Sequence, residues 1–197
     1  VTPIDMENNH PKPWEQCPHI WKTEAQFWTF VRGVLRKGWS KHPLKLEFIK
    51  TNRKRIVNPV EKNRKRFPEC WGMTCAICNT DTVQNMVEID HIGEGSSFTG
   101  LHDVEKYVAH LFLVDYTTLR SVCKPCHKIE NQRQRKGISF EEAAIEKEVI
   151  NILKTESKED VINFIEMWDF DGNYLTNNEA SRRMSLLEIY TFIYKGE

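Results

Sequence analysis

Two Cys-x-x-Cys pairs constrain the fold of this chain more than any other feature of its 197 residues. The first pair is Cys75 and Cys78, the second is Cys123 and Cys126, and 44 residues separate the two. Four thiolates at these spacings satisfy a tetrahedral zinc ion and leave no coordination position open, as in structural zinc sites. We therefore expect one structural zinc per chain; the alternative is four unrelated thiols.

The other two cysteines, Cys17 and Cys70, stand apart and are expected to be free, partly buried thiols. The other interpretation is that Cys70 replaces Cys75 as a zinc ligand. Residues 1–16 lack the basic-then-apolar pattern of a signal peptide, and the longest apolar run, 108–114, is much shorter than a membrane-spanning helix. Both observations favour a cytoplasmic protein with reduced thiols.

A net charge of zero conceals a strongly basic segment. Residues 32–66 carry 13 Lys or Arg and only 2 Glu, whereas residues 141–197 carry 6 basic and 13 acidic residues. The basic segment favours a polyanionic partner such as double-stranded DNA, whose phosphates it would neutralise; the alternative is a solvated basic face. The residues that we expect to contact DNA are Arg53, Lys54, Arg55, Arg64, Lys65 and Arg66.

Local patterns predict a mostly helical chain with two short strands. Capping-box patterns at 23–26 and 139–142 each open a helix, and the first helix is expected to end at Gly38. Alternating residues predict strands at 86–92 and 118–122. Further helices are expected over residues 101–113, from 126 to 137, over 161–168 and over 178–193. Residues 58–70 contain two prolines among basic residues and are expected to form a linker or arm.

The residues between and after the cysteine pairs carry the chemistry. Asp90 and His91 end the predicted strand between the pairs, and His127 directly follows the second pair. Along the chain, the order is a CxxC pair, a strand ending in Asp-His, an insertion, a short strand, and CxxC-His before a helix. This order resembles the HNH endonuclease family. That family has the ββα-metal fold, and the likeness covers residues 75 to about 135, roughly a third of the chain.

The resemblance implies that His91 is the general base and that Asp90 and His127 hold a catalytic Mg²⁺ or Mn²⁺. Hydrolysis of a phosphodiester needs a base for water and a cation for the developing charge, and these residue types suit both tasks. Adjacent strand residues point to opposite faces, so Asp90 and His91 converge only if the strand ends or bends, which Gly93 and Gly95 permit. The alternative for His127 is a group near the zinc or a replacement zinc ligand.

The chain departs from the family pattern at Thr118. The family has an asparagine there, which braces the loop that carries the base, and a threonine hydroxyl is expected to replace the amide only in part. A 26-residue interval separates His91 from Thr118 and is expected to hold an extra helix that shapes the substrate groove. We expect His102 and His110, both within this interval, to be structural.

The expected fold class is α+β, with a zinc-stabilised ββα-metal, treble-clef-like core in a mostly helical chain. We expect an N-terminal helical, basic DNA-contacting region over 1–66, the nuclease core over 67–140 and an acidic helical region over 141–197.

The expected activity is metal-dependent hydrolysis of DNA, by nicking or by double-strand cleavage. The resemblance is to small phage-encoded free-standing or homing endonucleases, which implies a bacterial or phage-infected cell. One alternative is a catalytically weak or inactive zinc-stabilised DNA-binding module. The other is a structural subunit of a larger DNA-processing assembly, docked through the acidic C-terminal region.

Overall fold

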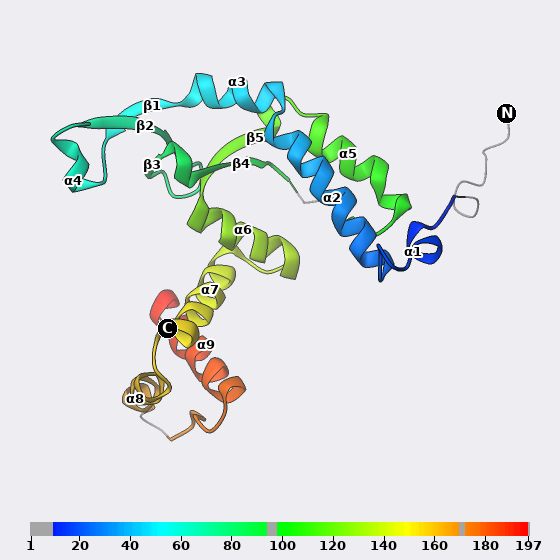
Figure 1. The fold of residues 1–197 in the computed structure, drawn as a ribbon. Coiled ribbons are helices and arrows are strands. Elements are labelled where there is room, and N and C mark those ends of the chain that lie inside the picture. The colour runs from blue at the N-terminus through cyan, green and yellow to red at the C-terminus, as the bar shows by residue number, and fades with distance from the viewer. Residues whose placement is uncertain (1–9, 94–97, 170–171, 197) are drawn as a thin grey trace. The chain divides into compact units, whose positions relative to one another are not determined.

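A computed structural model describes residues 10–93, 98–169 and 172–196 as a mixture of α-helices and two small β-sheets (Figure 1). The expected mixed α and β class is confirmed, and most of the ordered residues are helical. The chain divides into two compact units, Val1–Lys124 and Pro125–Glu197. The three-part division expected from the sequence stays a prediction.

Three α-helices of the first unit precede its sheets along the chain, α1 (Pro13–Gln16), α2 (Glu24–Ser40) and α3 (Pro43–Asn52), and α5 (Val104–Phe112) lies between the two strands of the second sheet. The Thr23 hydroxyl caps α2 by accepting the backbone N–H of Gln26, as the capping pattern predicts. The expected end at Gly38 is wrong, because α2 continues to Ser40. Gly38 instead permits close packing on α5, since a Cβ there would lie 3.2 Å from the Phe112 ring.

Residues 54–74 form a β-hairpin rather than the linker expected over 58–70. Strand β1 (Lys54–Val57) pairs with β2 (Glu69–Thr74), β2 pairs with β3 (Asp81–Val83), and the short helix α4 (Glu61–Arg64) lies at the tip of the hairpin (Figure 1). Buried Asn58 closes the hairpin: its amide donates to the Phe67 carbonyl at 3.0 Å, and its backbone N–H donates to the Pro68 carbonyl at 2.9 Å. No periodic pattern in the sequence relates Asn58 to Phe67 and Pro68. The sequence therefore did not predict that β1 pairs with β2.

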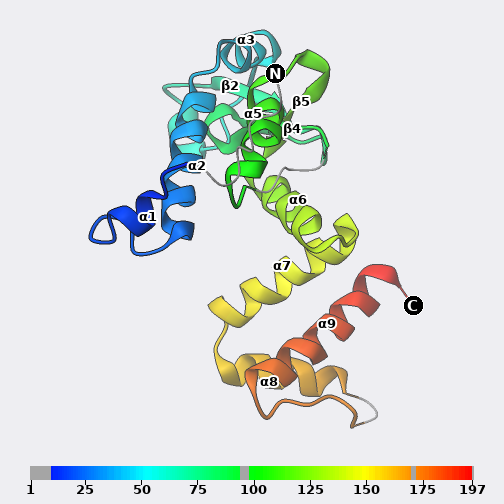
Figure 2. The same ribbon diagram turned by 90° about the vertical axis from the view of Figure 1, so that its right-hand side faces the viewer.

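The second sheet is the two-stranded ribbon of β4 (Val87–His91) and β5 (Leu119–Cys123), which confirms both predicted strands. Three short 3-10 helices flank the strands and α5: η1 (Gln84–Met86), η2 (Leu101–Asp103) and η3 (Tyr116–Thr118). Helices α2 and α5 lie side by side (Figures 1 and 2). They share one core with both sheets, built from Trp28, Trp39, Phe48, Met73, Ile89, Phe98, Tyr107, Leu111 and Leu119.

The second unit is helical and contains α7 (Phe140–Thr155), α8 (Lys158–Trp168) and α9 (Glu179–Lys195), which pack on one another (Figure 2). Helix α6 (Lys124–Lys136) begins at the boundary and ends at Gly137, whose φ of 65° favours glycine. The predicted capping box of α7 is present in full, with Ser139 and Glu142 bonded to each other's backbone N–H. The core consists of Val149, Val161, Ile165, Leu186 and Ile189. Within the described residues, every helix is too short or too polar to span a lipid bilayer.

Candidate functional site

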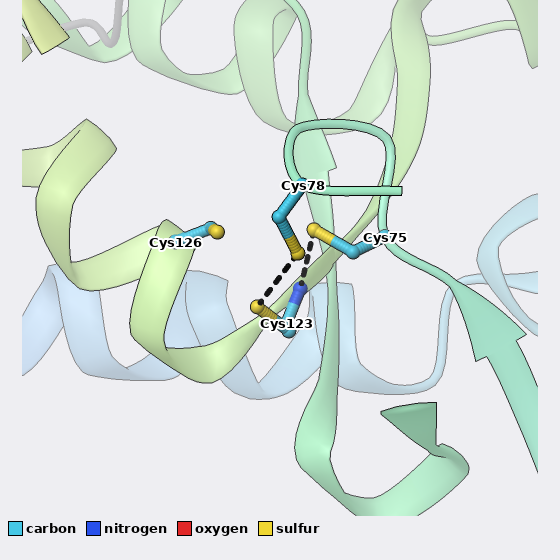
Figure 3. A group of neighbouring side chains, drawn as sticks. All are labelled: Cys75, Cys78, Cys123 and Cys126. Atoms are coloured by element: carbon cyan, nitrogen blue, oxygen red, sulfur yellow. Dashed lines mark hydrogen bonds between the residues drawn. The ribbon is translucent and has the colours of Figure 1, made fainter. Parts of the chain in front are cut away.

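The four cysteines of the two CxxC pairs come together after β2 and at the junction of β5 and α6 (Figure 3). Their sulfur atoms all lie within 4.8 Å of one another, and the Sγ atoms of Cys78 and Cys123 are 3.9 Å apart. Tetrahedral zinc with bonds of about 2.3 Å places its sulfurs about 3.8 Å apart. The cluster therefore has the donor set and the spacing to bind a metal ion such as zinc.

Local hydrogen bonds give the first cysteine pair its shape. The Asn79 N–H donates to the Cys75 carbonyl at 2.9 Å, and the Cys75 N–H donates to the Thr80 carbonyl at 3.0 Å. Asn79 adopts a left-handed φ of 54°, which asparagine tolerates better than most residues. The Cys123 N–H donates to the Cys75 sulfur at 3.3 Å, and this bond joins the second cysteine pair to the first.

Membership of the cluster resolves two alternatives from the sequence. Cys75 is fully buried within the cluster, whereas Cys70 lies on β2 outside it, so Cys70 does not replace Cys75. Cys17 and Cys70 are free and half-buried, as predicted. Within the described residues, the group with metal-ligand spacing consists of the four cysteines and does not include His127, which is half-buried on α6 directly after Cys126.

Asp90 lies on β4 and bonds to Arg120 on the facing strand. The register pairs the two residues, and the Arg120 Nε and Nη2 atoms donate to one Asp90 carboxylate oxygen at 3.0 and 2.8 Å. The side chains are only 13% and 21% exposed, so this ion pair is shielded from water. The sequence analysis did not single out Arg120, although antiparallel pairing of the two predicted strands would have placed it near Asp90.

His91 lies between two aromatic rings from distant helices. Its ring centroid is 4.5 Å from that of Trp39 on α2 and 4.9 Å from that of His110 on α5. Burial lowers the pKa of His91 below its ordinary value, and the charge of His110 lowers it further; a backbone hydrogen bond with Leu111 acts in the opposite direction. His91 is therefore a neutral imidazole at neutral pH, which is the form that can accept a proton.

The position of the His91 ring also restricts that role. Its Nε2 atom is buried and has no hydrogen-bond partner within the described residues. In this state a water molecule does not reach Nε2. His110, expected from the sequence to be structural, is one of the groups that hold the ring in place.

The structure does not bring Asp90 and His91 to one face of the ribbon. Strand β4 keeps its register through both residues, so their side chains leave it on opposite faces. The backbone turns after His91, at Gly93, whose φ of 119° favours glycine. Gly95, the other residue predicted to permit a bend, lies outside the described residues.

Thr118 is close to the His91 strand end, but its hydroxyl serves its own turn. The hydroxyl donates to the Asp115 carbonyl at 2.9 Å and accepts the Asp115 N–H at 3.0 Å, which forms a capping box at η3. The Thr118 carbonyl accepts the Ile92 N–H at 2.8 Å. Thr118 thus bonds to the residue after His91 through its backbone carbonyl, and the bracing role expected of its side chain stays a prediction.

The six basic residues expected to contact DNA lie on the β1–β2 hairpin or next to it. Lys54 pairs with Asp81 at 2.7 Å, and Arg64 donates to the Asn58 carbonyl at 2.7 Å. Arg66 lies over the Phe67 ring, and Lys65 is exposed. Arg53 and Arg55 both lie over the Trp71 ring, an arrangement that the sequence did not predict.

No model of a protein family, no curated protein and no solved structure matches the chain. The site itself defines the class: a mixed α and β protein with a four-cysteine group that can bind a metal such as zinc.

Proposed function

We propose that the chain is a metal-dependent endonuclease of the HNH type, which hydrolyses DNA phosphodiester bonds. The observation that carries the proposal is the order β4, β5, α6 along the chain, together with a four-cysteine group from two places in it. One cysteine pair lies between β2 and β3, ahead of β4, and the other lies at the junction of β5 and α6. A zinc ion bound there would fix the ribbon that bears Asp90 and His91. This order is also the order of a ββα-metal core.

In the proposed reaction, His91 accepts a proton from the attacking water, since burial keeps its imidazole neutral. Nε2 is covered, so the His91 ring must leave the stack between Trp39 and His110 when DNA binds. Because β4 points Asp90 and His91 to opposite faces, the same movement is needed to bring the base to the scissile phosphate.

Asp90 and His127 would hold the catalytic cation, because a carboxylate oxygen and an imidazole nitrogen suit Mg²⁺ or Mn²⁺ and leave positions for substrate. When bound, the cation stabilises negative charge on the phosphate and the leaving oxygen. Arg120 holds the Asp90 carboxylate in place through two hydrogen bonds. Asp90 must share its carboxylate between Arg120 and the cation.

A second function, a zinc-stabilised DNA-binding module without activity, is favoured by two specific observations. The buried Nε2 of His91 and the opposed directions of Asp90 and His91 are both expected of residues that no longer catalyse. The two functions make different demands on His91. Catalysis requires the ring to move, whereas binding alone does not.

The test is incubation of supercoiled plasmid with the parent protein, purified without chelator so that a tightly held zinc stays in place. Parallel reactions contain Mg²⁺, Mn²⁺ or no added divalent ion. We expect conversion to open-circular or linear DNA only with added metal. A protein that shifts the plasmid on a gel but leaves it supercoiled with either metal would instead be the inactive module.

A further inference from the structure

The exposed face of the β1–β2 hairpin brings two arginines onto one tryptophan. The register pairs Arg55 with Trp71, and Arg53 lies two positions before Arg55, in an extended conformation between the end of α3 and the start of β1. The guanidinium carbon of Arg53 is 4.3 Å from the Trp71 ring centroid, and that of Arg55 is 5.2 Å away. Both distances are within the range of a cation–π interaction. We call these three residues the arginine–tryptophan cluster.

The cluster is on the surface, where a partner can reach it. Trp71 is 41% exposed, although tryptophan side chains are on average largely buried. Arg53 has no carboxylate partner among the described residues. Arg55 pairs with Glu69 at 3.4 Å, but both side chains are about half exposed, so the pair is weak and easily exchanged.

The charge around the cluster selects the class of partner. Residues 53–71 contain 7 basic and 2 acidic residues, and most of the basic ones lie at the tip around α4. A partner for this surface must therefore carry regularly spaced negative charge. Phosphates of a nucleic acid meet that requirement, and arginine donates to phosphate oxygens in pairs.

The role of Trp71 follows from the arginines that cover it. Two guanidinium groups already lie over the ring, so it is poorly placed to stack on an unpaired base. Instead the ring holds two long, flexible side chains near one position, and arginines that are already ordered lose less freedom when they bind. From Trp71 toward its tip the hairpin is not paired with β3, and a two-stranded ribbon has the width to enter the major groove of duplex DNA.

We propose that the β1–β2 hairpin binds the backbone of duplex DNA through Arg53 and Arg55, and that Trp71 is a positioning residue for both. The inference rests on the proposed function only in taking DNA as the polyanion. It goes further by assigning the contact to two of the six predicted basic residues. Of the others, Arg64 donates to the Asn58 carbonyl, and Lys54 pairs with Asp81 at 2.7 Å, a shorter distance than the 3.4 Å between Arg55 and Glu69.

The experiment measures binding of a fluorescent DNA duplex by anisotropy at several NaCl concentrations, without added divalent metal so that no cleavage occurs. The variants are Arg53→Gln with Arg55→Gln, Trp71→Ala and Trp71→Phe. Lys154→Gln with Lys158→Gln is the matched control, because it removes two exposed charges from the second unit. Zinc content and thermal unfolding check that each variant is folded.

For the double arginine variant, we expect the slope of log affinity against log salt to fall by about 2, since each lost phosphate contact removes about 0.9. The lysine control should keep the parental slope. Trp71→Ala should weaken binding by about 3- to 10-fold while the slope stays nearly parental, because both charges remain. Trp71→Phe should restore most of the affinity.

Two results would overturn the proposal. The first is a parental slope in the double arginine variant. The second is a Trp71→Ala protein that binds the duplex as tightly as the parent, or that loses affinity mainly for a single-stranded probe, as base stacking would require. If the parent binds duplex as described but cuts no plasmid, the hairpin assignment stands and the nuclease proposal falls. If the parent does not bind duplex at all, both fall.

Discussion

The four-cysteine cluster and the end of β4 at Asp90–His91 belong to the same small core, but residues at very different sequence distances define them. The first cysteine pair is shaped by bonds within residues 75–80, and Cys123 closes on it through one N–H···S bond. The His91 ring is instead held by Trp39, 52 positions earlier, and by His110 on the inserted helix α5. A motif can thus specify the four-cysteine group by itself, whereas the surroundings of His91, the proposed base, depend on the rest of the chain.

The largest loss of zinc and of stability should come from breaking the cysteine cluster. Cys75→Ser removes a fully buried ligand, and a structural zinc in small domains contributes on the order of 10 kcal/mol to folding. We expect the variant to lose zinc and the cooperative unfolding of the first unit. Elemental analysis and thermal unfolding measure both quantities.

Cys70→Ser is the matched control, because Cys70 is a half-buried thiol outside the cluster. It should retain one zinc per chain and unfold within a few degrees of the parent. Loss of zinc from Cys70→Ser, or retention of zinc by Cys75→Ser, would show that the assignment of the ligands is wrong.

The next largest loss of stability is expected from breaking the ion pair between Asp90 and Arg120, beside His91. Arg120→Met leaves the Asp90 carboxylate shielded from water and without its two charged donors, which should cost about 2 to 3 kcal/mol of unfolding free energy. Urea unfolding measures the loss. Asp90→Asn combined with Arg120→Met should recover part of it, and a double variant as unstable as the sum of the two singles would show that the pair is not coupled.

A smaller effect is expected at Thr118. Thr118→Ala removes two hydrogen bonds of the η3 capping box, which should cost about 1 kcal/mol, while the backbone bond to Ile92 remains. Cleavage in single turnover should therefore fall by less than about 10-fold. A loss of 100-fold or more at unchanged DNA affinity would show that the hydroxyl acts on the base directly.

Acid should weaken the same capping box. Hydrogen bonds from the Thr117 hydroxyl and from backbone N–H groups lower the pKa of Asp115. Its stabilising contribution is therefore fully present above about pH 4, the unfolded value, and is lost as the pH falls through the lowered pKa. Asp115→Asn should flatten this part of the stability profile, measured by urea unfolding at several pH values; an unchanged profile would contradict the assignment.

The smallest effect on zinc content and DNA binding is expected from a change in the second unit. Ser139→Ala removes the N-cap of α7 and should cost about 1 kcal/mol, or roughly 4 to 8 °C in the unfolding temperature of a unit of this size. Zinc content and DNA binding should stay parental. Loss of zinc in this variant would mean that α7 supports the metal group, contrary to the local definition of the cluster.

Much of this molecule follows from sequence patterns that act over short distances. The cysteine spacing, the capping box at Ser139 and the strands around Asp90 all depend on neighbouring residues, and the structure confirms each of them. The β1–β2 hairpin was missed because buried Asn58, ten residues from Pro68, closes it through bonds that leave no periodic pattern. The stack of His91 between Trp39 and His110 was missed for the same reason, since it is tertiary contact alone that joins them.

The most direct test of the account is to measure zinc content and plasmid cleavage on the same preparation of His91→Ala. His102→Ala is the matched control, because His102 is an exposed histidine on the inserted segment that follows His91. We predict that His91→Ala contains one zinc per chain and binds DNA like the parent, but cuts at least about 100-fold more slowly with Mg²⁺ or Mn²⁺, while His102→Ala cuts at the parental rate. Parental cleavage by a folded, zinc-containing His91→Ala protein would contradict the assignment of His91 as the base.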